Sequence, residues 1–132
     1  MNPERAIPLL RVADVEQSIA WYQKHFGFNV DAFPDESPHV FAVLTKGPAE
    51  IMLRKSKFGR QKGWEDWDVR IPLSSGLFEL HALLSSQGLV TRHLERMPYC
   101  DTEFDVCDPD GYVICFSQNV GRVDGVTERA EA

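Results

Sequence analysis

The sequence predicts an α+β fold built from two tandem β-α-β-β-β modules, and an internal repeat is the main observation behind this prediction. An apolar strand, a helix and a closing glycine occur twice, and similar residues recur at a constant offset of 61 positions, as Leu10 and Ile71 do. The length of 132 residues suits one compact domain. Since each helix can bury only one face of its sheet, the open faces of the two sheets could together form a concave pocket.

The first module is predicted over residues 5–55. It begins with a strand at 5–12, and a helix then runs between Asp14, a good N-cap residue, and Gly27, which can adopt the left-handed conformation that ends helices. Proline-rich and glycine-rich turns separate the three strands that follow, which we expect near 28–33, 38–45 and 49–55.

The second module is predicted over residues 66–118, after a non-periodic linker at 56–65. A strand at 66–73 and a helix at 75–87 are followed by a strand near 90–96 and a hairpin of strands at 101–107 and 112–118, whose turn is Asp108-Pro109-Asp110-Gly111. Residues 1–119 thus form the predicted domain. The polar, patternless residues 120–132 are expected to be a flexible tail.

Composition excludes several classes of protein. The net charge of −6 disfavours nucleic-acid binding, which needs a basic surface for the phosphates. No apolar run is long enough to span a membrane, and the N-terminus lacks a signal-peptide pattern, so we expect a cytoplasmic protein. Three cysteines without a Cys-x-x-Cys pair argue against a disulfide framework and against a zinc site.

Strand alternation predicts which side chains lie on the open faces of the sheets. In the last hairpin, Phe104 and Ile114 share an apolar face, so Asp105 and Cys115 lie on the other. The same argument places six charged residues on open faces: Arg11, Glu50, Arg54, Asp68, Arg70 and Asp105. Two interpretations remain open, namely ion pairing on a partly wet sheet or at a dimer interface, and a polar cavity whose arginines hold an anionic or carbonyl-bearing ligand.

Three segments resemble the vicinal oxygen chelate superfamily, which includes glyoxalase I, extradiol dioxygenases, and fosfomycin and bleomycin resistance proteins. The segments are residues 6–14, the helix sequence 18–22 leading to Phe26-Gly27-Phe28, and residues 103–111. The likeness spans about residues 5–118. It implies a cupped, partly open β-barrel of paired modules, the glyoxalase/bleomycin resistance fold, commonly in a homodimer.

The resemblance also implies where a metal would bind, because enzymes of this family hold a divalent ion with His, Gln or Glu at matching strand positions. Those positions are occupied here by Ile7, Met52, Asp68 and Cys115. An aliphatic side chain cannot coordinate a hard cation, and a thioether is a poor substitute. We therefore expect neither a metal nor another cofactor.

Loss of the metal ligands points to the bleomycin resistance branch, whose members sequester an antibiotic without chemistry. The resemblance thus implies a metal-free small-molecule binding protein with aromatic-lined grooves and no catalytic residues. Phe33 and Tyr99 are further aromatic candidates. The candidate ligand-binding residues are Phe41, Arg54, Trp64, Trp67, Arg70 and Asp105.

Two alternative functions remain. One is a divalent-metal-dependent lyase, isomerase or dioxygenase of the same superfamily, with an atypical site around Asp68 and Cys115. The other is an interaction module whose open sheet forms a dimer interface and leaves no room for a ligand.

Overall fold

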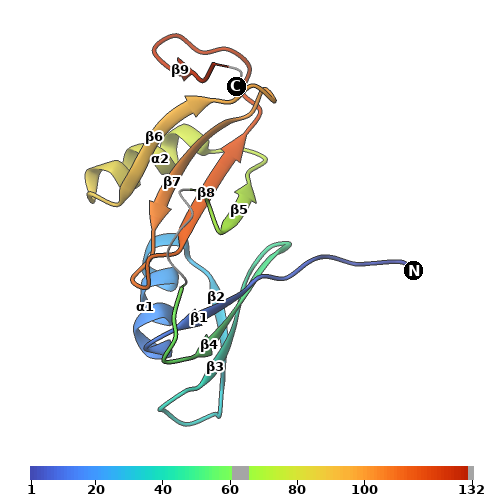
Figure 1. The fold of residues 1–132 in the computed structure, drawn as a ribbon, viewed down its shortest axis with the longest axis vertical. Helices are drawn as coiled ribbons and strands as arrows, with labels where there is room; N and C mark the ends of the chain where they lie inside the picture. The colour runs from blue at the N-terminus through green and yellow to red at the C-terminus, as the bar shows by residue number, and fades with distance from the viewer. Residues whose placement is uncertain (61–65, 131–132) are drawn as a thin grey trace. The chain divides into compact units, whose positions relative to one another are not determined.

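The computed structural model describes residues 1–60 and 66–130, and the chain divides into two compact units (Figure 1). Unit 1 contains the first module together with the turn Asp108–Tyr112, and unit 2 contains the rest of the second module. Each unit has one helix and one mixed sheet, which confirms the predicted α+β class and the β-α-β-β-β order.

Unit 1 holds a four-stranded sheet in the order β1-β4-β3-β2. Strand β1 lies parallel to β4, whereas the other neighbours are antiparallel. The elements are β1 (Leu9–Val12), α1 (Val15–Phe26), β2 (Asn29–Phe33), β3 (Phe41–Lys46) and β4 (Ala49–Lys55).

Helix α1 begins and ends where its capping residues predict. The Asp14 carboxylate accepts the Gln17 N–H at 3.0 Å, and Gly27 ends the helix with a φ of 70°, in the left-handed region that favours glycine. The helix buries Val15, Tyr22 and Phe26. Apolar strand residues buried in the same unit include Leu10, Val12, Leu44, Ile51 and Leu53.

Unit 2 holds a five-stranded sheet in the order β5-β8-β7-β6-β9 (Figure 1). Its elements are β5 (Val69–Pro72), α2 (Leu77–Ser86), β6 (Val90–Arg96), β7 (Thr102–Cys107), β8 (Val113–Gln118) and β9 (Thr127–Glu128). Helix α2 starts two residues later than the sequence predicts. Gly76 precedes it with a φ of 87° and has no side chain to cap the helix, but the Gln118 side-chain oxygen accepts the Leu77 N–H at 3.1 Å.

The register predicted for the last hairpin is confirmed. Phe104 pairs with Phe116 and Asp105 pairs with Cys115, so aromatic core residues lie on one face and polar residues on the other. The ring of His81, on α2, packs against the ring of Phe104 at a centroid distance of 5.1 Å. Helix α2 therefore covers the Phe104 face, and the Asp105 face stays open.

The C-terminal segment contributes the short strand β9, which pairs in parallel with the outer edge of β6. The Arg129 N–H donates to the Arg96 carbonyl at 2.8 Å. Both residues of β9 are exposed and polar, so they leave no alternating apolar pattern from which a strand could be predicted.

Candidate functional site

A cavity of about 620 Å³ lies on the open face of unit 2. Its walls come from β5, β6 and β7, from the loop that joins β6 to β7, and from the C-terminal segment. The residues that matter most for its chemistry are Trp67, Arg70, Arg92, Tyr99, Glu103 and Asp105.

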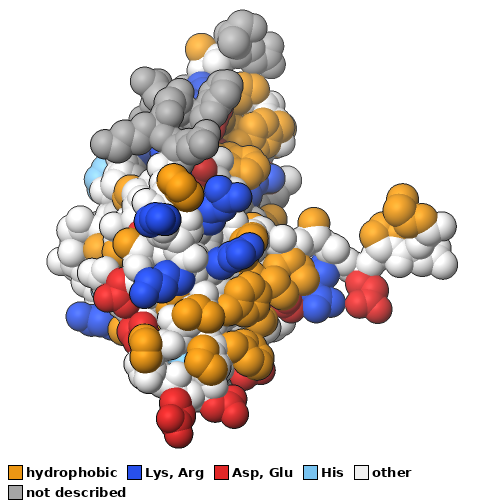
Figure 2. Space-filling view, turned by 60° about the horizontal axis from the view of Figure 1, so that its bottom comes forward, with side chains coloured by type: hydrophobic (Ala, Val, Ile, Leu, Met, Phe, Trp, Pro, Cys, Tyr) orange, Lys and Arg blue, Asp and Glu red, His pale blue; other side chains and the backbone are white. Residues whose placement is uncertain are grey.

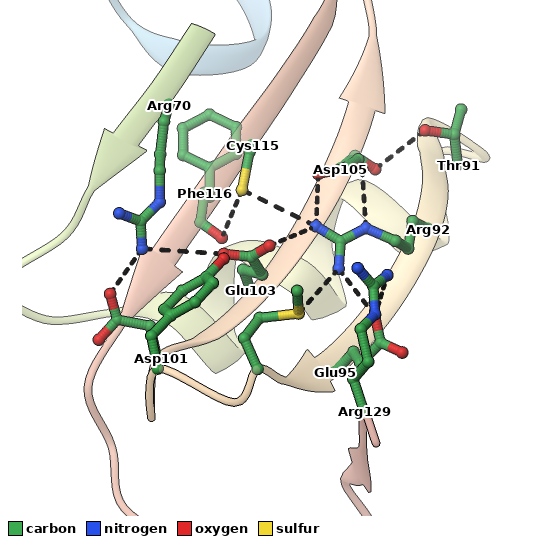
Figure 3. Close-up of polar contacts among 12 residues, drawn as sticks. Arg70, Thr91, Arg92, Glu95, Asp101, Glu103, Asp105, Cys115, Phe116 and Arg129 are labelled. Atoms are coloured by element: carbon green, nitrogen blue, oxygen red, sulfur yellow. Dashed lines mark hydrogen bonds and ion pairs between the residues drawn. The ribbon is translucent and has the colours of Figure 1, made fainter. Parts of the chain in front are cut away.

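Arg92 lies at the centre of a network of ion pairs in this cavity (Figure 3). Its Nε lies 2.8 Å from Asp105 Oδ2, and its Nη2 lies 2.8 Å from Glu103 Oε1. The other terminal nitrogen, Nη1, lies 3.0 Å from Glu95 Oε1. A single guanidinium group thus holds three carboxylates from two neighbouring strands.

Arg70 is a second anchor, at the β5 side of the cavity (Figure 3). Its Nη2 pairs with Asp101 at 2.5 Å and lies 3.7 Å from Glu103 Oε2. The Tyr99 hydroxyl donates to that same carboxylate oxygen at 2.7 Å. The Arg70 guanidinium also lies 5.4 Å from the centre of the Tyr99 ring, within the range of a cation–π contact.

Burial explains why these carboxylates are paired. Glu103 is 1% exposed and Asp105 is 6% exposed, and a charge at such positions is costly unless it is compensated. Burial by itself would lower the pKa of Arg92. The hydrogen bonds and charges of Asp105 and Glu103 outweigh burial and raise that pKa above its ordinary value, so Arg92 stays charged.

The same environment keeps two further groups protonated. Burial, then the hydrogen bond to Glu103, raises the pKa of the Tyr99 hydroxyl. Burial, then the negative charges of Glu103 and Asp105, raises the pKa of the Cys115 thiol. Since the thiolate is the reactive form of cysteine, Cys115 is poorly suited to act as a nucleophile.

The C-terminal segment completes the network through Arg129, whose Nη2 lies 2.6 Å from Glu95 Oε1. Burial would raise the pKa of Glu95, but the hydrogen bonds from Arg129 and Arg92 lower it below its ordinary value. Glu95 thus links the central arginine of the cavity to the end of the chain.

The structure brings together three of the six residues predicted to bind a ligand, Trp67, Arg70 and Asp105, and it places the further aromatic candidate Tyr99 beside them. Phe41 and Arg54 belong to unit 1, where they are partners on the neighbouring strands β3 and β4. The remaining predicted residues are Trp64, which falls outside the described residues, and Phe33, whose ring lies 6.4 Å from that of Phe41.

Unit 1 keeps apolar side chains in contact with solvent. Ile7 is 36% exposed, Leu9 is 48% exposed and Phe33 is 42% exposed. In the space-filling view of Figure 2, hydrophobic side chains gather beside those of Lys and Arg. Such surfaces are typical of interaction sites. A binding role for Phe41 and Arg54, which belong to the same unit, stays a prediction.

Sequence reasoning missed Arg92 and Glu103. Arg92 has the same parity as Val90 and Leu94, so strict alternation would place it with the core. The pairing of β6 with β7 shifts register on both sides of Arg92, and these irregularities allow it to share the open face with Glu95. Glu103 did carry a signal, because it lies two residues before Asp105.

Two of the four residues at the family's metal-ligand positions, Ile7 and Met52, offer no oxygen or nitrogen donor for a divalent ion. The Asp68 carboxylate accepts the Val113 N–H at 2.9 Å, and Cys115 is buried. Within residues 1–60 and 66–130, no three His, Cys, Asp or Glu side chains are grouped so that they could hold a metal ion.

A sequence model of the Glyoxalase/Bleomycin resistance protein/Dioxygenase superfamily matches residues 6–116, and the chain belongs to this superfamily. No curated protein matches the chain in sequence. Within the described residues, no helix is both long enough and apolar enough to cross a bilayer.

Solved structures support the fold. TioX from Micromonospora sp. ML1 is 18% identical with a TM-score of 0.71, and the match covers 89% of this chain and 100% of TioX. A glyoxalase-related enzyme from Clostridium phytofermentans is 13% identical with a TM-score of 0.69, over 91% of this chain and 98% of that one. Lactoylglutathione lyase from Agrobacterium tumefaciens is 14% identical with a TM-score of 0.66, over 89% and 96%.

Proposed function

We propose that this chain is a metal-independent binding protein for a small, planar, uncharged molecule, which it holds in the cavity of unit 2. The observation that carries the proposal is that all three arginines lining this cavity are already paired with carboxylates. The cavity volume of about 620 Å³ is that of an ordinary small-molecule site.

The pairing argues against a strongly charged ligand. Three arginines and three carboxylates line the cavity; of these carboxylates, Glu103 and Asp105 are buried and paired, whereas Asp66 is exposed. Arg70 is held by Asp101, Arg92 by Glu103 and Asp105, and Arg129 by Glu95. An anion would have to compete with carboxylates already in place, and a cation with arginines. A neutral ligand avoids both costs, because it leaves the buried pairs intact.

Two aromatic side chains at the cavity favour a planar ligand. Trp67 is 41% exposed and Tyr99 is 54% exposed, so both keep apolar area in contact with solvent. Exposed aromatic faces beside a cavity offer apolar area and stacking at little cost in conformational entropy. The hydroxyl of Tyr99 is already engaged with Glu103, so its ring is held in place.

The proposal includes a role without chemistry. Ile7 and Met52 offer a metal no oxygen or nitrogen donor, and the raised pKa of the Cys115 thiol disfavours the reactive thiolate. Sequestration of a planar antibiotic, as in the bleomycin resistance branch, would use such a cavity.

We also propose that the chain forms a homodimer. Sedimentation of the purified protein tests this, and a monomer at all concentrations would contradict it.

The test is a calorimetric titration with three naphthalene probes that share one ring system and carry a neutral, an anionic or a cationic substituent: 2-naphthol, naphthalene-2-sulfonate and 2-naphthylmethylammonium. We expect 2-naphthol to bind most tightly. Trp67→Ala should weaken its binding by about ten-fold, because an aromatic contact is worth about 0.5–1.5 kcal/mol beyond its buried area. Phe58→Ala is the matched control, since Phe58 is an exposed aromatic residue of unit 1. Preference for either charged probe, or an equal effect of both variants, would refute the proposal.

A metal titration tests whether binding by this chain is independent of a metal. Zn²⁺ or Ni²⁺ binding that is lost in Asp68→Asn or Cys115→Ser would show that the family's metal positions are functional. The chain would then be a candidate metal-dependent lyase, isomerase or dioxygenase rather than a metal-independent binder.

A further inference from the structure

Two histidines meet on the helix-covered side of unit 2, away from the cavity. His81 is on α2 and His93 is on β6, and their facing atoms, Nε2 of His81 and Nδ1 of His93, lie 3.0 Å apart. The His81 ring packs against Phe104, whose side chain points to the face opposite Glu103 and Asp105. The pair therefore lies outside the proposed ligand site.

The spacing of these nitrogens matches that of two ligands on one metal ion. Imidazole nitrogens bind zinc at about 2.0–2.1 Å, so two of them in neighbouring coordination positions lie about 3 Å apart. We propose that His81 and His93 form a two-histidine site for a divalent transition-metal ion such as Zn²⁺ or Ni²⁺. Water fills the remaining coordination positions.

The chemistry of the donors selects this class of ion. Neutral imidazole suits zinc, copper and nickel, whereas calcium and magnesium need oxygen ligands. The two rings can share a single proton in their hydrogen bond, so both can be uncharged.

The surroundings restrict the motion of one ligand and leave the other accessible. The ring of His81 is packed on Phe104, and the Ser85 hydroxyl lies 3.4 Å from its Nε2. His93 is exposed, so an ion can reach the pair from solvent without opening the fold.

The experiment is a calorimetric titration of the chelator-treated, dialysed protein with Zn²⁺ and with Ni²⁺. We expect one ion per chain. His93→Ala should weaken binding by at least the effect of removing an outer-shell partner, about ten-fold. His81→Ala should do the same, and circular dichroism shows whether it still folds. His93 is exposed, so its substitution keeps the test valid even if His81→Ala unfolds.

His39→Ala is the matched control, because Nδ1 of His39 is hydrogen-bonded to the Pro34 carbonyl oxygen at 2.8 Å in unit 1. Its metal affinity should equal that of the original protein. An unchanged affinity in His93→Ala would overturn the proposal.

Ring signals in NMR locate the ion independently. Paramagnetic Ni²⁺ should broaden the signals of His81 and His93 before those of His25 and His39. Equal broadening of all four histidines would mean non-specific binding and would overturn the proposal. Binding that survives both His substitutions but disappears in Asp68→Asn would instead contradict the metal-independent function. The two proposals can therefore fail separately.

Discussion

Replacing Arg92 with methionine tests the network at the centre of the cavity. Methionine keeps most of the length of the side chain but removes the cation that holds Glu103 and Asp105 at 2.8 Å each. Those carboxylates are 1% and 6% exposed, so water cannot replace the lost partner. Breaking a buried ion pair by removing one partner costs about 3–5 kcal/mol. Because the Arg92 side chain is 24% exposed, we expect the lower end, about 3 kcal/mol.

Urea unfolding, followed by circular dichroism, measures this loss. With a slope of about 1–3 kcal/mol per molar, the midpoint should fall by 1 M or more. Arg5→Met is the matched control, because Arg5 pairs with Glu50 at 2.9 Å but is 47% exposed. An exposed pair of this kind contributes about 0.2–1 kcal/mol.

A compensating variant separates the charge effect from lost packing. Arg92→Met combined with Glu103→Gln and Asp105→Asn removes the buried negative charges together with their cation. Much of the lost stability should return, because the main cost of the single substitution is an uncompensated buried charge. If Arg92→Met loses no more unfolding free energy than Arg5→Met does, then the network is solvated like a surface ion pair, and the cavity is not held in place by buried charge pairs.

Four further predictions concern single residues. Tyr22→Phe removes the hydroxyl that donates to the buried Asp108 carboxylate at 2.7 Å, so the free energy of unfolding should fall by about 1–3 kcal/mol in urea. Burial raises the pKa of Asp108 above its ordinary 3.8. The raised pKa contributes folding stability that is fully present below pH 3.8 and is lost as the pH rises through the raised pKa. The difference in unfolding free energy between the original protein and Asp108→Asn should therefore shrink over that range. Arg129→Ala should raise the pKa of Glu95 back towards 4.5 in a carboxyl NMR titration; the lowered pKa of Glu95 contributes stability above 4.5 that is lost as the pH falls, and the variant should lose part of it. Gly27→Ala places a side chain at a φ of 70° and 3.1 Å from Lys46 Nζ, so it should cost about 1–2 kcal/mol of thermal stability, and an unchanged melting temperature would contradict the left-handed cap.

Helix capping and strand alternation predicted the helices and strands, because both patterns depend only on residues that are neighbours in the sequence. Asp14 and Gly27 mark the ends of α1, since a capping carboxylate and a left-handed glycine act within one turn of the helix. Alternation predicted the pairing of Asp105 with Cys115, because the hairpin turn sets the register of the strands beside it. Alternation also placed Arg70 and Asp105 on the open face of the sheet, where both line the cavity.

The same rules failed where the backbone departs from a regular strand. The irregular pairing of β6 with β7 hid Arg92, although its guanidinium group is the main cation of the cavity. Two exposed polar residues form β9, which is held by backbone hydrogen bonds to β6 and by ion pairs rather than by apolar burial. Alternation has nothing to detect in such a strand.

The sequence by itself determined the repeated module, the class of fold and the identity of the residues at the metal positions, because each of these is written in neighbouring residues or in residue type. Only the tertiary structure decided which charges neutralise one another, and which histidines meet. Ion pairs and ligand pairs depend on distances of a few ångströms between residues far apart in the chain, and such distances are set by strand register and packing rather than by any local pattern.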